Sequence, residues 1–232
     1  MNNLLQSEVF ILTLVIGTYL IATLLYTKTN IKLLHPLLSS IMVIILFLND
    51  LGIEYETFKQ GSHLIHFMLG PSVVALGYVL YEQMKYLKGN VISILTSVFV
   101  GAIVGIVSVI VIGKLMGAED ALIATLEPKS VTTPIAMGIS EKNGGIPSLT
   151  AVIVVAVGIF GSIIGPMVMK VLGIESRIAK GLALGASSHG VGTAAAIQIG
   201  AVEGALSGLA IGLMGIMTAI LVPVITYIIS LF

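Results

Sequence analysis

Residues 181–200 read GLALGASSHGVGTAAAIQIG, and the fold is decided in this stretch. Two short apolar arms flank a polar centre that runs from Ser187 to Thr193. Gly190 and Gly192 favour an interruption of the helix at this centre. Each arm has about 8–10 residues, which at about 1.5 Å per residue reach ~15 Å, near the midplane of a bilayer. The stretch therefore predicts a broken helix with a polar tip at membrane depth.

A second stretch has the same design. Residues 121–140 read ALIATLEPKSVTTPIAMGIS, with the polar run EPKS in the middle. When the chain is shifted by 60 residues without a gap, the two stretches align tip to tip, and Lys129 falls opposite His189. The coincidences include Val131/Val191, Thr133/Thr193, Ala136/Ala196 and Ile139/Ile199. Weak internal symmetry of this kind is typical of secondary transporters, so we predict an internal repeat.

The composition restricts the class of protein. Of 232 residues, 57% are hydrophobic and 9% are charged, whereas a soluble domain has roughly 25% charged residues. A soluble domain and a disordered chain are therefore excluded. The absence of cysteine excludes disulfide scaffolds and thiolate metal sites, and the zero net charge gives no indication of nucleic acid binding. The segment before residue 9 has no Lys or Arg, so we expect no cleavable signal peptide.

Six apolar stretches are long enough to be membrane-spanning helices, which need about 20 residues. They cover residues 9–26, 33–49, 64–81, 91–113, 146–169 and 205–231. We therefore predict an all-α integral membrane protein with about six transmembrane helices plus two re-entrant or broken segments in an inverted repeat. Residues 1–62 are expected to form a two-helix scaffold and homodimer contact, and residues 63–232 a transport-like repeat region.

The distribution of basic residues predicts the orientation. If both broken segments are re-entrant and the N-terminus lies outside, seven basic residues face the cytoplasm and three face outside. The seven are Lys28, Lys32, Lys85, Lys88, Lys170, Arg177 and Lys180. If both segments cross fully, the count is five against five. The positive-inside rule favours the re-entrant arrangement, although full, unwound crossings stay open.

Two polar tips near the midplane would form a binding site, because non-helical backbone at this depth is tolerated only where it is buried or lines a cavity. Helices that start near residues 131 and 191 would point N–H groups and partial positive charge at an anion. Hydroxyl groups, a cation, an imidazole and glycine backbone complete a site suited to a small carboxylate. The predicted substrate-binding residues are Lys129, Ser130, Thr132, Thr133, Ser187, Ser188, His189, Gly190, Gly192 and Thr193.

Proton coupling is assigned to Glu127 and His189, since an ionisable residue in the membrane is a functional hypothesis by default. The alternatives are that Glu127 lies in an interfacial loop and that His189 is a packing histidine. Gly70 and Pro71 should kink or break the third span, as a gate or as a simple bend. The two other kink positions that we expect are Pro128 and Pro134.

No enzyme, cofactor or metal site is predicted. His63 and His66 lie three residues apart, but nearby acidic residues are too loosely placed to complete a metal site. The Gly190–Gly192 pair lacks the third glycine and the preceding strand of a dinucleotide site.

Three motifs resemble the LrgB/CidB family of bacterial membrane proteins. They are EPKSVTTP at residues 127–134, SHGVGT at 188–193 and LGP at 69–71, and the resemblance covers nearly the whole chain. It implies a multi-pass protein of the bacterial cytoplasmic membrane with a small LrgA/CidA-like membrane partner. Family members are often described as antiholin-like, with a role in murein hydrolase export and lysis. Plant relatives resemble plastid glycolate/glycerate transporters, and some bacterial relatives are linked to pyruvate uptake.

Two functions follow from the resemblance. One is a secondary transporter of small monocarboxylates, and the other is a holin/antiholin-type regulator of murein hydrolase activity and cell lysis. Paired polar tips inside a repeat favour the transporter, because a regulator has no need of them.

Overall fold

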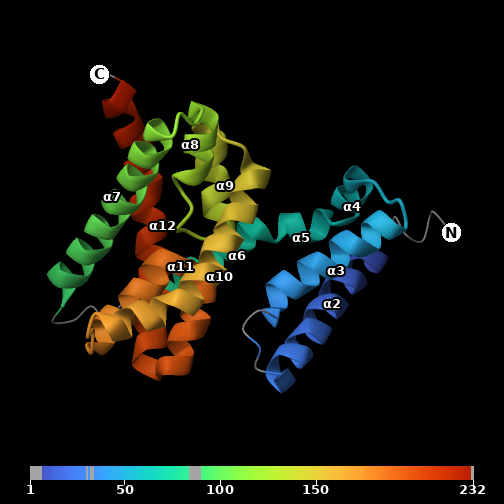
Figure 1. Ribbon diagram of the computed structural model, residues 1–232, viewed down its shortest axis with the longest axis horizontal. Coiled ribbons are helices and arrows are strands. Elements are labelled where there is room, and N and C mark those ends of the chain that lie inside the picture. Colours follow the sequence, from blue (N-terminus) through green and yellow to red (C-terminus); the bar gives the residue numbers. More distant parts are fainter. Residues whose placement is uncertain (1–6, 30, 32–33, 84–89, 231–232) are drawn as a thin grey trace. The chain divides into compact units, whose positions relative to one another are not determined.

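The computed structural model describes residues 7–29, 31, 34–83 and 90–230. Every regular element among these residues is a helix, as the sequence predicts (Figure 1). The chain divides into two compact units, Met1–Ser72 and Val73–Phe232.

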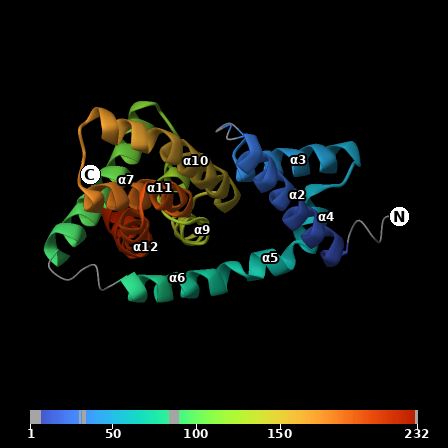
Figure 2. The ribbon, with the colours of Figure 1, turned by 90° about the horizontal axis from the view of Figure 1, so that it is seen from below.

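The first unit contains an antiparallel helix pair, with α2 at Glu8–Thr29 and α3 at Pro36–Asp50. Helices α2 and α3 lie side by side (Figure 2). The rings of Phe10 and Phe47 meet across the pair, with centroids 6.3 Å apart. Helix α2 has the length of a membrane span, whereas α3 has 15 residues and is shorter than the expected span. The expected start of that span, residue 33, lies outside the described residues.

The third predicted span is interrupted. Two short helices, α4 at Tyr55–Gly61 and α5 at His63–Phe67, precede α6 at Leu69–Gln83. The break between α5 and α6 falls at Met68, so Gly70 and Pro71 lie in the first turn of α6. Proline is tolerated there, because the N–H that it lacks would have no partner within the helix.

The second unit contains residues 73–83 of α6 and a bundle formed by the helices that follow (Figure 1). They are α7 at Val91–Leu115, α8 at Asp120–Leu126, α9 at Thr133–Lys142, α10 at Pro147–Val171, α11 at Arg177–Ile199 and α12 at Ala201–Ser230. Within the described residues, four helices are long and apolar enough to cross a membrane: α2, α7, α10 and α12. The chain is therefore a multi-pass membrane protein.

Helix α7 shows how the core is built. One narrow stripe of its side chains, at a spacing of four residues, is buried against α12 and α8, while apolar side chains on its other faces stay exposed. The stripe consists of Ile94, Val98, Ala102, Ile106 and Ile110. Exposed apolar faces of this extent indicate that the bundle is surrounded by lipid.

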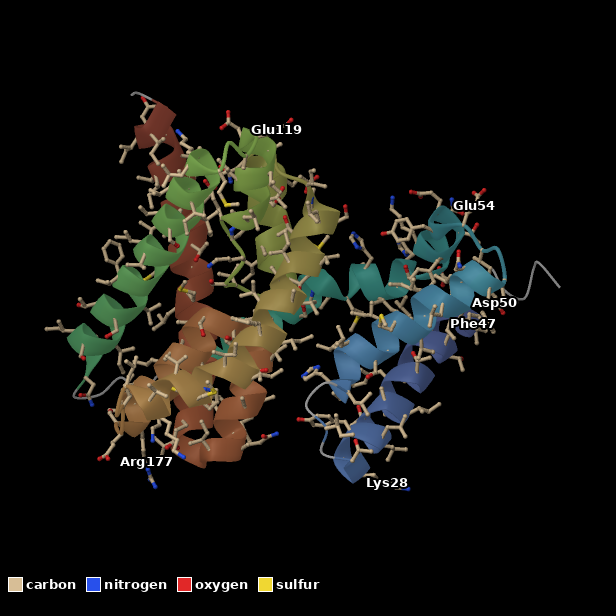
Figure 3. All side chains as sticks on the ribbon, in the orientation of Figure 1. Lys28, Phe47, Asp50, Glu54, Glu119 and Arg177 are labelled. Atoms are coloured by element: carbon tan, nitrogen blue, oxygen red, sulfur yellow. The ribbon has the colours of Figure 1, made fainter. Side chains whose placement is uncertain are left out.

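Charged side chains mark the ends of the apolar helices (Figure 3). Lys28 lies in the last turn of α2, Glu119 directly before α8, and Arg177 at the start of α11. Figure 3 shows Glu119 and Arg177 at opposite ends of the second unit. Three lysines of the orientation count, Lys32, Lys85 and Lys88, lie outside the described residues, so the orientation stays a prediction.

Candidate functional site

The first predicted broken segment is a hairpin. Helix α8 ends at Leu126 and α9 begins at Thr133, and the six residues between them are not α-helical. At its base, Thr150 of α10 has its Oγ1 2.7 Å from Ser140 Oγ and 3.1 Å from the carbonyl oxygen of Thr125. All three of these residues are fully buried. Since Ser140 near the end of α9 returns to the level of Thr125 in α8, the chain folds back on itself.

The second predicted broken segment is also a hairpin. Helix α11 is interrupted at His189, which has a φ of 43° and a ψ of −134°. A Cβ added to Gly192 would meet the backbone carbonyl of Leu184, eight residues earlier in the chain. In a continuous helix these two residues would be about 12 Å apart along the axis. Residues 177–188 and 190–199 are therefore two arms that run back along each other.

The two hairpins begin at opposite ends of the bundle. The base of the second hairpin lies at the start of α12, where Arg177 Nε is 3.7 Å from Glu203 Oε1. The first hairpin lies toward the other end of α12, where Thr226 Oγ1 donates a hydrogen bond of 3.4 Å to Glu127 Oε1. This arrangement suits opposed re-entrant segments. The relation of the two segments as an inverted repeat stays a prediction.

Both tips lie at the same level along α10. His189 Nε2 is 2.9 Å from the carbonyl oxygen of Val154, and a Cβ on Gly158 would meet the imidazole. Helix α9 runs antiparallel to α10, with Ser140 beside Thr150. From this contact, seven residues back along α9 lead to residue 133, and seven residues forward along α10 lead to residue 157. Each of these steps covers about 10 Å along its helix, so residues 133 and 157 lie at the same level. The N-terminus of α9 and the tip of α11 therefore reach the middle of the 25-residue helix α10.

Two side chains of the first hairpin contain polar atoms without partners: Glu127 lies two residues after Thr125 at the base, and Thr132 lies at the tip. Glu127 is 5% exposed, and its Oε2 has no hydrogen-bond partner among the described residues. The buried Oγ1 of Thr132 also lacks one, although Thr132 is the N-cap residue of α9. Lys129 Nζ donates a hydrogen bond of 3.2 Å to Ser130 Oγ, and both side chains are half-buried. Buried polar atoms of this kind require water, an ion or a ligand.

The same tip adds the N-terminus of α9. The first N–H groups of a helix have no intrahelical partner, and Thr132 makes no side-chain cap here. The fixed φ of Pro134 in the first turn is compatible with the helix and leaves one donor fewer to satisfy. The result is a small region of partial positive charge beside Lys129.

At the second tip, most polar side chains have hydrogen-bond partners within the protein. The His189 imidazole is directed to the backbone of α10, which is the packing arrangement that the sequence left open. Thr193 Oγ1 donates to the carbonyl oxygen of His189 at 3.1 Å and lies 2.7 Å from Ser207 Oγ. Ser187 Oγ and Ser188 Oγ are 2.9 Å apart, and Ser188 is fully buried.

Glycines allow the second hairpin to pack closely against its neighbours in the bundle. On α10, a Cβ at Gly158, Gly161 or Gly165 would meet a side chain of α11. On the hairpin itself, Gly192 packs against the first arm, whereas Gly190 has open space around it. Gly190 and Gly192 were both predicted to let a ligand approach the backbone, and of the two only Gly190 is exposed.

The LrgB-like family matches residues 15–228. The chain belongs to the LrgB-like family. Among its relatives, YxaC of Bacillus subtilis is 33% identical over 94% of this chain and 95% of its own length. Holin-like protein CidB of Staphylococcus epidermidis is 34% identical, with coverage of 97% and 98%. Antiholin-like protein LrgB of Bacillus mycoides is 34% identical, with coverage of 88% and 90%. No solved structure matches this chain.

Several polar contacts of this LrgB-like chain could not be predicted from the sequence. Thr125, Ser140 and Thr150 join the base of the first hairpin, and Thr226 contacts Glu127 from 99 residues away. A single hydroxyl in an apolar helix is a weak signal, because it can also bond to the preceding turn of its own helix. Its partner becomes visible only when the helices are packed.

Proposed function

We propose that this LrgB-like protein is a secondary transporter that moves small monocarboxylates, of the pyruvate, glycolate or glycerate type, across the bacterial cytoplasmic membrane. The observation that carries the proposal is the first hairpin tip, where the start of α9 and the unpartnered Thr132 Oγ1 lie at the level of the second tip and at mid-depth of α10. Polar, non-helical backbone in this position is characteristic of substrate sites in transporters built from broken helices.

The first tip supplies the chemistry for a carboxylate. The N–H groups at the start of α9 donate to its oxygens, with Lys129, Ser130 and Thr132 as further donors. The second tip closes the site with Gly190 and Ser187, its two exposed residues. The remaining predicted residues of that tip, among them His189 and Thr193, hold the hairpin together.

Glu127 is the group proposed to carry a coupling proton. It is buried, has a single weak hydrogen bond to Thr226, and has one oxygen free to bind a proton. A carboxylate without a compensating charge is costly at this depth, so its proton would be exchanged together with the anionic substrate. Transport of this kind needs no covalent step, cofactor or metal.

The rest of the arrangement belongs to the same proposal. The N-terminus lies outside, the second hairpin enters from the cytoplasm, and residues 1–62 form a scaffold and a homodimer contact. An LrgA/CidA-like membrane protein is the proposed partner. The hairpin bundle moves against the scaffold and exposes the site to each side in turn.

Uptake of labelled pyruvate and labelled glycolate into proteoliposomes tests the proposal. We expect uptake by the wild-type chain, with or without the partner protein, and a loss of at least about tenfold in Lys129→Gln, since a charged hydrogen bond contributes about 1.5–3 kcal/mol. Lys142→Gln is the matched control, because Lys142 is an exposed lysine at the base of the same hairpin. Equal uptake by the two variants would remove Lys129 from the site.

The second candidate is a holin/antiholin-type regulator of murein hydrolase activity and lysis. It is favoured by the names of two relatives, holin-like protein CidB and antiholin-like protein LrgB. Failure to take up any small acid, with the partner present, would favour the regulator over the transporter. Altered carboxylate flux could itself produce lysis phenotypes, so lysis alone does not separate the two functions.

A further inference from the structure

A cavity of about 400 Å³ lies at the base of the second hairpin, away from both tips. Its walls come from the end of α10, the connection to α11, and the two ends of α11. Because the first turn and the last turn of α11 both line it, the cavity touches the point where the hairpin enters and leaves the bundle.

The charges around the cavity are predominantly positive. Lys170 in the last turn of α10 and Lys180 in the first turn of α11 line it, together with Glu175 in the connection between them. Two lysines against one carboxylate leave a net positive charge. The neighbouring Arg177 is paired with Glu203 at 3.7 Å, so it adds little to this excess.

The cavity is also lined by apolar residues. Pro166 lies one turn before Lys170, toward the centre of α10, while Met169 is next to Lys170 and Ile199 ends the second arm at the hairpin base. Beside the cavity, Met167 is 65% exposed and Ile197 is 62% exposed, although both are apolar. Exposed apolar side chains at the end of a membrane span indicate contact with lipid chains. Along α10, the lining thus changes from the apolar Pro166 to the cationic Lys170 toward the end of the helix.

We propose that this cavity binds an anionic phospholipid, with the phosphate between Lys170 and Lys180 and an acyl chain against Pro166, Met169 and Ile199. Basic pockets between membrane helices are the sites that anionic lipid headgroups occupy. A lipid held here contacts both ends of the α11 hairpin, so its binding stabilises the position of the hairpin base.

Native mass spectrometry of the full-length protein, titrated with phosphatidylglycerol or with phosphatidylcholine, tests the site. Each lysine near an anionic lipid contributes about fivefold in affinity, so Lys170→Gln together with Lys180→Gln should weaken phosphatidylglycerol binding about 30-fold. Phosphatidylcholine binding should not change. The matched control is Lys142→Gln, which removes an exposed lysine from the base of the other hairpin and should leave phosphatidylglycerol binding unchanged.

Three further measurements test whether the variants are folded and whether the cavity binds lipid or a free anion. The melting temperature of each variant in detergent shows whether the fold is intact, and the single lysine variants replace the double variant if it unfolds. Inorganic phosphate at millimolar concentration should not displace the lipid, and displacement would show a free-anion site instead. Displacement by pyruvate would make the cavity an entrance for substrate. Either displacement, or equal loss of lipid in Lys142→Gln, would overturn the lipid assignment.

Discussion

Replacement of His189 by glycine and by alanine separates the backbone role of this residue from its side-chain role. His189 is the sole non-glycine residue with a positive φ among those described, at 43°. A non-glycine residue in such a region costs about 1–3 kcal/mol. Alanine keeps that cost and glycine removes it, while both lose the imidazole bond to Val154 O, which is worth about 0.5–1.5 kcal/mol.

The two substitutions should therefore rank in an unusual order. In an ordinary helix, glycine is less stable than alanine by about 1 kcal/mol. At position 189 we expect His189→Gly to be more stable than His189→Ala by about 1–2 kcal/mol, because the relief of strain outweighs the flexibility of glycine. For a chain of this length the difference corresponds to about 2–8 °C in melting temperature.

Thermal unfolding of both variants in detergent, followed by calorimetry, measures the difference. The matched control is Ser187, two residues earlier, which is exposed and has ordinary helical backbone. There Ser187→Gly should melt below Ser187→Ala. If His189→Gly melts at or below His189→Ala, the hairpin tip is not strained and the reasoning fails.

Three more predictions concern the hairpins. Glu127→Gln should fold normally but abolish the dependence of pyruvate uptake on a pH gradient, measured in proteoliposomes; uptake that still follows the gradient would exclude Glu127 as the proton carrier. Gly185→Ala places a Cβ against the backbone of Ser207 and should lower the free energy of unfolding by about 1–3 kcal/mol, whereas Gly101→Ala, inside α7 with open space around it, should raise it by about 0.5–1 kcal/mol. Thr150→Val removes a hydroxyl that joins Thr125 and Ser140, and a loss of about 1–3 kcal/mol in chemical unfolding is expected; an unchanged midpoint would contradict the cluster.

The breaks in the helices could be predicted because their causes are local. Proline at 128 and 134 and the polar run between them do not fit an apolar helix, and the first break lies within that run. The second break could be placed among serine and glycine residues, but its residue could not. Gly190 and Gly192 favoured an interruption in this run, whereas the residue with the positive φ in the structure is His189.

The candidate site could be predicted only in part, because side-chain direction is not a local property. His189 was a predicted ligand for the substrate, and the structure directs its imidazole to Val154, 35 residues away. Gly192 was expected to admit a ligand, and it instead permits contact with Leu184 in the opposing arm. In the first hairpin, by contrast, Glu127 and Thr132 keep polar atoms without partners.

The sequence alone therefore determines the all-helical membrane character, the family and the positions of the two polar breaks, because hydropathy, charge and the backbone limits of proline and glycine act within a few residues. The tertiary structure decides which way each broken helix turns, the depth that its tip reaches, and which polar atoms remain available to a ligand. These properties depend on packing between segments such as Glu127 and Thr226, which are 99 residues apart in the chain. A hydrogen bond at that separation exists only after the helices have packed.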